Sequence, residues 1–197
     1  ATVPPIRWNF LAWFLIFAGM AAMDPFIPVL VDSLAGGADS ATVIGTLLAA
    51  YGLLMGVATP IAGRLADRLG AERIFLLAAP ALALISVGIG MAWSIPMLAV
   101  LVMMRAIPQA STAVVLYSHL AKVVPVRYRG PVVSLTPMPR NIAWFVGPGL
   151  AAAATGFGLA GVFFVAAALF GGAGIVAVLM SRASKPAYCP LPRPICA

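Results

Sequence analysis

Apolar residues run through this chain in long blocks, and only short polar segments separate them. Several blocks carry no charged side chain over about twenty positions, the length that an α-helix needs to cross a hydrocarbon core of about 30 Å. The blocks are apolar on all sides, whereas the strands of a membrane barrel alternate apolar and polar residues. The pattern predicts an all-α integral membrane protein with six spans, at 8–31, 43–62, 74–93, 97–120, 131–154 and 159–180.

Composition excludes a soluble domain. Of the 197 residues, 63% are hydrophobic and only 9% are charged, and the mean hydropathy is +1.08. Soluble domains carry about 25% charged residues, because a core of any size still needs a polar skin. The chain is therefore expected in the lipid bilayer, and its net charge of +7 is explained by topology without nucleic acid.

The basic residues fall on one side of the six predicted spans. They lie at Arg7, in the segments 63–73 and 122–130, and in the proline-rich tail 182–197. Basic loops stay in the cytoplasm. Both termini are therefore predicted to be cytoplasmic, and the chain divides into a six-helix bundle at 1–181 and the tail.

The segment 63–73 concentrates charge, with three arginines, an aspartate and a glutamate between uncharged flanks. It predicts a short aqueous loop that joins the second and third spans. Topology accounts for Arg64, Arg68 and Arg73, but it does not account for Asp67. Asp67 therefore calls for a further role.

Two predicted spans carry both a proline and an ionisable side chain well inside the membrane. The first has Asp24 beside Pro25, and the fourth has Arg105 near Pro108. Each charge lies roughly 10–12 Å from the outer end of its span. Because the two triplets of spans have opposite orientation, the pattern predicts a 3+3 inverted repeat of the kind that builds secondary transporters.

Buried charges leave two kinds of interpretation open. A carboxylate in hydrocarbon costs at least about 2.5–3.5 kcal/mol, so Asp24 either takes part in proton coupling or forms a static ion pair with Arg105. Arg105 either orients Asp24 and binds an anionic group or ties the two spans together. Arg140, expected near the middle of the fifth span, contacts substrate or packs against helix ends. Further polar contacts are expected from Tyr51, Gln109 and Tyr117.

Residues 8–181 resemble the major facilitator superfamily. The segment 63–70, Gly-Arg-Leu-Ala-Asp-Arg-Leu-Gly, is similar to that family's signature between its second and third helices. Arg105 with Gln109 resembles its fourth-helix motif, and Gly147 with Pro148 resembles the fifth-helix motif of proton-coupled exporters. The stretch 24–28 is similar to the first helix of drug:proton antiporters.

The resemblance implies one half of a twelve-helix transporter, similar to the amino-terminal half. Such a half works as a homodimer or with a second six-helix half, in proton-coupled export of small lipophilic or amphipathic compounds. Asp24, Arg105, Gln109 and Arg140 are then the coupling or substrate residues, and the gate lies at Asp67. The other gate residues are Gly63, Arg68, Gly70 and Arg73.

The expected location is a bacterial inner (plasma) membrane, with the chain as a multi-pass protein. A different class stays open: a non-transporting, transporter-derived subunit that scaffolds a larger membrane complex. An enzyme is not expected, because the sequence has one histidine and no catalytic or metal-ligand pattern. No cofactor and no metal are expected either.

Overall fold

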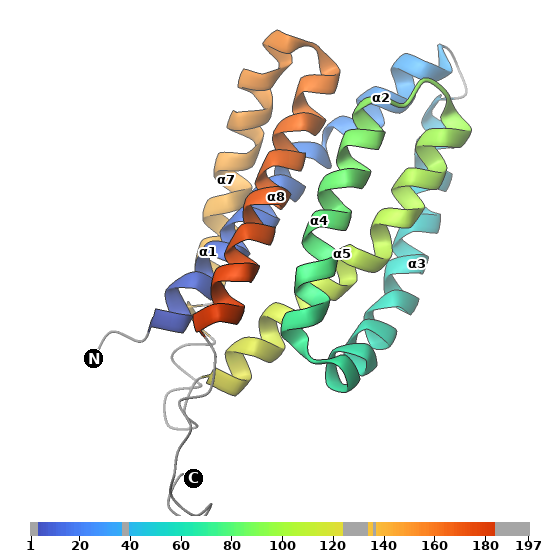
Figure 1. Cartoon of the computed structure of the whole chain (residues 1–197). Helices are drawn as coiled ribbons and strands as arrows, with labels where there is room; N and C mark the ends of the chain where they lie inside the picture. Colours follow the sequence, from blue (N-terminus) through green and yellow to red (C-terminus); the bar gives the residue numbers. More distant parts are fainter. Residues whose placement is uncertain (1–3, 37–39, 124–133, 136, 184–197) are drawn as a thin grey trace, which may run out of the picture.

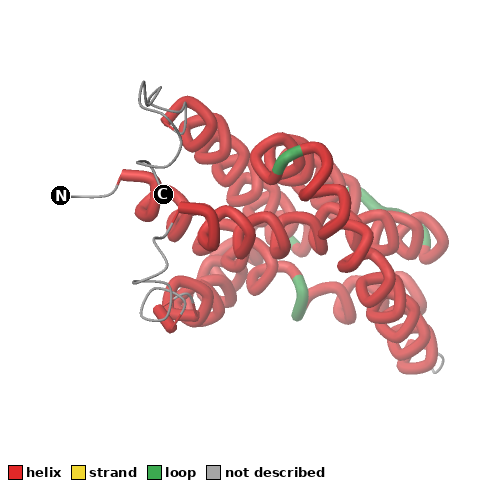
Figure 2. The backbone as a smooth tube through the Cα atoms, turned by 90° about the horizontal axis from the view of Figure 1, so that it is seen from below, coloured by secondary structure: helices red, strands yellow, loops and turns green. Residues whose placement is uncertain are grey.

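A computed structural model describes residues 4–36, 40–123, 134–135 and 137–183, and these residues form a bundle of helices (Figure 1). The elements are α1 (Pro4–Met23), α2 (Phe26–Ala35), α3 (Ser40–Leu69), α4 (Ala71–Gly90), α5 (Ile95–Val123), α7 (Pro137–Ala154), the 3-10 turn η2 (Thr155–Phe157) and α8 (Leu159–Ala183). Short turns join the helices, and the described ranges contain no strand (Figure 2). The prediction of an all-α bundle is confirmed.

Five helical stretches are long and apolar enough to cross a membrane. They are Arg7–Ala35, Ser40–Leu69, Ala71–Gly90, Ile95–Tyr117 and Leu159–Leu179. A sixth helix, α7, has 18 residues with Arg140 and Asn141 near its beginning, and it is not among the five. The membrane prediction is therefore supported for five spans by length and hydropathy. Of the fifth predicted span, at 131–154, the structure describes mainly the helix α7.

The first predicted span is not one continuous helix. It breaks at Asp24 and Pro25, where α1 ends and α2 begins. The amide of Asp24 still donates to the carbonyl of Met20 at 2.9 Å. Pro25 and Pro28 have no N–H, so two carbonyls in this turn lose their helical donors. The break removes Asp24 from a regular helix in the middle of the membrane-spanning stretch.

The predicted loop at 63–73 is wrong. The helix α3 continues to Leu69, only Gly70 is non-helical, and α4 begins at Ala71. Gly70 has a φ of 89°, a conformation that residues with a Cβ avoid. Leucine, arginine and alanine favour helix. A helix satisfies its own backbone hydrogen bonds both in lipid and in water, so α3 can continue beyond the end of its apolar stretch.

The helices pack in two groups, which α4 and α8 join. The helix α1 lies against α7 and α8, α5 lies against α3 and α4, and α4 also packs on α8. The largest fully buried side chains include Trp13, Met23, Leu82, Phe163 and Phe170. Only 11% of the apolar window of α3 is buried, against 39% to 50% in the other four candidate spans. Among the described residues, no helix therefore covers one side of α3.

The surroundings of the glycines show where helices pack closely and where a helix surface is open. A Cβ on Gly147 of α7 would lie 2.7 Å from the Cβ of Ala21 and 2.8 Å from the carbonyl oxygen of Ala18, so α7 and α1 meet there backbone to backbone. By contrast, a Cβ on Gly45, Gly52 or Gly56 of α3 would meet nothing within 4 Å. These three glycines of α3 therefore make no close contact with another helix of the described residues.

Four chain segments that carry or precede basic residues lie at one end of the bundle. They are the beginning of α1, the turn from α3 to α4, the end of α5 and the end of α8 (Figure 1). This arrangement agrees with basic residues gathering on one side. The predicted basic loop from 124 onward and the tail from 184 onward lie outside the described residues.

Candidate functional site

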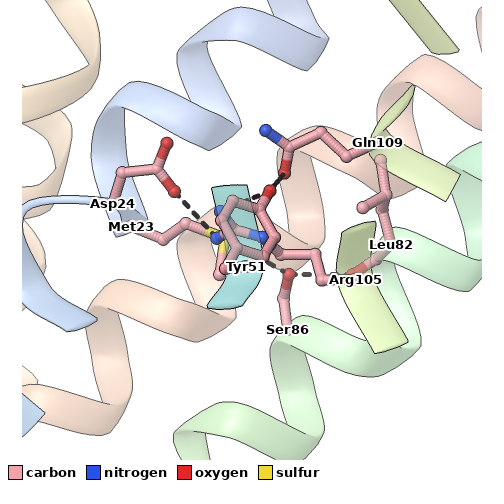
Figure 3. Close-up of polar contacts among 7 residues, drawn as sticks. All are labelled: Met23, Asp24, Tyr51, Leu82, Ser86, Arg105 and Gln109. Atoms are coloured by element: carbon pink, nitrogen blue, oxygen red, sulfur yellow. Dashed lines mark hydrogen bonds and ion pairs between the residues drawn. The ribbon is translucent and has the colours of Figure 1, made fainter. Parts of the chain in front are cut away.

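The two charges singled out in the sequence meet inside the bundle. Arg105 Nη1 of α5 lies 2.8 Å from Asp24 Oδ1, which the break between α1 and α2 presents toward α5 (Figure 3). The Arg105 side chain is 3% exposed and that of Asp24 is 29% exposed. Each charge offsets the cost of burying the other. The arginine is thus enclosed by protein, while the carboxylate remains partly accessible.

Two further polar side chains extend this pair. Arg105 Nη2 donates a hydrogen bond to the hydroxyl of Tyr51 at 3.1 Å, and that hydroxyl donates to Gln109 Oε1 at 2.7 Å. The guanidinium also lies over the Tyr51 ring, 4.9 Å from its centroid, at a distance typical of cation–π contacts. Asp24, Arg105, Tyr51 and Gln109 therefore form one connected polar cluster, which draws on α3, α5 and the helix break (Figure 3).

The polar cluster keeps unused hydrogen-bonding capacity. Arg105 Nη1 is close to Asp24 Oδ1 but is not aligned with it as a hydrogen bond, and no side chain of the described residues accepts from Arg105 Nε. An arginine has five N–H donors and cannot lose its proton in a protein. The cluster is therefore a fixed positive charge with a neutralising carboxylate that is partly open to its surroundings.

Arg140 is not part of the polar cluster. It is the fourth residue of α7 as the structure describes that helix, and it precedes Gly147 by roughly 10 Å along the axis. Gly147 is the residue that contacts α1 at Ala18 and Ala21. The part of α7 that the structure describes begins at Pro137, so the position of Arg140 near the middle of the predicted span stays a prediction.

The predicted gate residues lie at the other end of α3. Asp67, Arg68 and Arg73 are exposed around the turn at Gly70, and Gly63 is half-buried. Asp67 is sixteen positions from Tyr51, so the turn lies roughly 24 Å along α3 from the polar cluster. Asp67 has no ion-pair partner within the part of the chain that the structure describes.

The two residues of the helix-five motif have different surroundings. Gly147 is buried where α7 meets α1, while Pro148, the next residue, is exposed. Gly147 therefore has a packing role that the structure makes explicit. Pro148 has no N–H, so it also weakens the regular hydrogen bonding of α7 at this level.

Ser86 and Asn9 are among the buried polar residues that sequence reasoning missed. Ser86 of α4 donates to the carbonyl of Leu82 at 2.8 Å and lies 3.6 Å from Met23 Sδ, just before the helix break. Asn9 Nδ2 of α1 donates to the carbonyl of Leu116 at 3.5 Å. Single polar residues inside apolar stretches were the available signal for both.

Tyr117 does not join the polar cluster. Its ring packs edge-on against Trp13, with the ring centroids 4.6 Å apart and the planes at 87°. The residue is 48% exposed. Of the three residues expected to add polar contacts, Tyr51 and Gln109 do so, and Tyr117 makes an aromatic contact.

A bundle of apolar helices with a charged cluster between them defines a polytopic membrane protein built around a buried polar site. The sequence model of the Major Facilitator Superfamily matches residues 9–193, and the chain therefore belongs to the major facilitator superfamily. No curated protein gives a significant match to the chain. Members of this family are transporters and not enzymes, so the chain is a multi-pass membrane protein of the major facilitator transporter type.

Proposed function

We propose that this chain is a proton-coupled secondary transporter that exports small lipophilic or amphipathic compounds, with Asp24 as the proton acceptor. The observation that carries the proposal is the ion pair of Asp24 with Arg105 at the break between α1 and α2. A partly exposed carboxylate can receive a proton, whereas a buried guanidinium keeps its charge. The site is thus built to change its net charge by one.

Protonation of Asp24 links this change to movement. The neutral carboxyl no longer attracts Arg105 as an ion, while Arg105 keeps its hydrogen bond to Tyr51. The break at Pro25 is then free to move away from α5, because it is not held by continuous helical hydrogen bonds. In this mechanism Arg105, Tyr51 and Gln109 stay together as the fixed side of the site, and Asp24 is the moving side.

The packing of the helices supports a 3+3 inverted repeat. The helix α3 packs on α5 as α7 packs on α1, and α4 packs on α5 as α8 packs on α1. If α1, α3 and α4 are exchanged with α5, α7 and α8 in that order, this set of contacts is unchanged. The helices α4 and α8, which correspond to each other, also pack on each other. Such repeats place binding groups at corresponding depths in transporters. The shared end of the basic segments supports cytoplasmic termini in a bacterial inner membrane.

The open side of α3 supports a partner in the membrane, either a second copy or another six-helix half. Leu53 is 76% exposed beside Gly52 and Gly56, and none of the described helices covers this strip. Asp67 at the end of α3 is the proposed gate residue, which accepts hydrogen bonds from a helix amino terminus of that partner. Arg68 and Arg73, around the glycine turn, belong to the same gate.

A second candidate function is a non-transporting, transporter-derived subunit of a larger membrane complex. It is favoured by the same ion pair, since Arg105 already neutralises Asp24 within one chain. A static pair of this kind ties two helices together. In that case Asp24 does not take up and release a proton as part of the protein's function.

Flux measurements on vesicles containing the purified chain separate these functions. With a fluorescent lipophilic dye and an imposed pH gradient, the parent should move dye and the Asp24→Asn variant should fall to the level of empty vesicles, because Asn cannot exchange the proton. Asp32→Asn is the matched control, since Asp32 is exposed at the end of α2. Undiminished flux in Asp24→Asn would sink the role of Asp24. Absence of gradient-driven flux in the parent would favour the subunit.

A further inference from the structure

An apolar groove lies on the outer surface of the bundle, away from the polar cluster. The end of α3, α4 and α5 enclose about 380 Å³ there. Its lining includes Leu65, Leu69, Leu77, Ala81 and Ile107. Its one hydroxyl, on Ser111, donates to the carbonyl of Ile107 at 2.8 Å, so the groove offers an occupant mainly aliphatic contacts.

The groove has the length of one membrane leaflet. On α4 it runs from Ile74 to Ile85, which is roughly 16 Å at the rise of an α-helix. Half of a hydrocarbon core of about 30 Å is about the same. Leu77 is 71% exposed and Ile107 is 60% exposed, so the groove opens toward the surroundings of the bundle.

The lining of the groove suits an acyl chain better than a helix of a partner protein. Helices in lipid pack closely over small residues, whereas this groove is lined mainly by leucine and isoleucine side chains. A single acyl chain is narrower and matches the aliphatic lining. The aliphatic lining therefore favours a lipid chain over a docked helix.

Basic residues stand where this groove reaches the end of the bundle. Arg73 precedes Leu77 by one helical turn of α4, and Arg68 directly precedes Leu69 of α3, both exposed. Around this turn Arg64, Arg68 and Arg73 outnumber the two acids, Asp67 and Glu72, by one. Basic pockets between membrane helices at the interface suit anionic lipid headgroups.

We propose that the groove binds an anionic phospholipid of the adjoining leaflet, with one acyl chain along α4 and its phosphate near Arg68 and Arg73. The two features needed are an aliphatic channel of leaflet length and positive charge at the end where a headgroup would lie. The site is separate from the polar cluster and does not depend on whether the chain transports anything.

Native mass spectrometry of the purified full chain tests this site. The chain is incubated with phosphatidylglycerol or phosphatidylcholine carrying identical acyl chains, and the retained lipid is counted. We expect preferential retention of phosphatidylglycerol, by about fivefold for each arginine near the phosphate. The preference should fall at high salt, because salt screens exposed charges. Arg68→Gln with Arg73→Gln should remove it, while Arg140→Gln should leave it unchanged.

Two variants test the apolar part. Ala81→Trp fills the groove, and Leu77→Gln makes its lining polar at an exposed position that folding tolerates; both should lower retention of both lipids. Leu84→Trp is the matched control, because Leu84 is 74% exposed on α4 outside the groove. Equal retention of the two lipids by the parent would overturn the proposal. The proposal would also be overturned if both groove variants retained as much lipid as the parent. A change in the oligomeric state of these variants with no change in the amount of retained lipid would overturn it as well.

Discussion

Arg105 makes three contacts in the membrane interior. It pairs with Asp24, donates to Tyr51 and lies over the ring of the same tyrosine. A buried charge that loses its partners costs far more than an exposed one. The tyrosine hydroxyl serves both neighbours at once, since it accepts from Arg105 and donates to Gln109.

Removing that hydroxyl should therefore destabilise the protein while leaving the ring contact in place. Tyr51→Phe leaves Arg105 and Gln109 each short of a hydrogen-bond partner, at a cost of about 1–3 kcal/mol. A lower midpoint of thermal unfolding in detergent should follow. Tyr117→Phe is the control, because Tyr117 contacts Trp13 through its ring. Equal midpoints for the two variants would contradict the importance of the polar cluster for stability.

At the scale of the elements, α1 packs against α7 and ends at the break before Pro25. The backbone contact at Gly147 lies one helical turn before the break at Asp24, against Ala21 and Ala18. The interruption therefore occurs next to a tightly packed turn, which fixes α1 up to the break and leaves the junction with α2 less constrained.

Gly147→Ala should separate α7 from α1. The new Cβ would lie 2.7 Å from the Cβ of Ala21 and near backbone atoms that cannot rotate away, and overpacking of this kind costs about 1–3 kcal/mol. Gly149→Ala is the matched control two residues later, where a Cβ meets nothing within 4 Å and alanine favours the helix. Thermal unfolding of the two variants checks this, and a Gly147→Ala protein as stable as Gly149→Ala would contradict the close contact.

On the scale of the whole molecule, burial is uneven. The described helices enclose one main core on the side of α1, α4 and α8, while α3 turns an apolar strip with three glycines outward. Small residues allow close approach of helices in lipid, so this strip of α3 is the surface best suited to pack against a second helix bundle.

The purified chain should accordingly form a homodimer through α3. Gly52→Trp places a large side chain on that strip and should convert dimer to monomer in analytical ultracentrifugation in detergent. Leu84→Trp, on the exposed face of α4, should leave the dimer intact. A parent that sediments as a monomer would contradict the homodimer and favour a separate partner.

Much of the fold was predictable. The span predicted at 159–180 is α8 at Leu159–Ala183, and that predicted at 74–93 is α4 at Ala71–Gly90. The end of α3 was not predictable from polarity, because the segment from Arg64 to Leu69 carries two opposing signals. Its charged residues suggest a loop outside the membrane, while its leucine, arginine and alanine residues favour a helix. The pairing of Asp24 with Arg105 was foreseen as one alternative, since few groups in the membrane can neutralise a charge.

The sequence by itself determined that this is a membrane protein of several apolar helices and that Asp24 and Arg105 lie within them. Hydropathy acts over about twenty consecutive residues, so the order of residues suffices. Only the tertiary structure decided that Tyr51 joins Arg105 and Gln109, 54 and 58 positions away, and that α3 stays open on one side. Such contacts depend on which helices pack together and at what rotation, which local pattern does not specify.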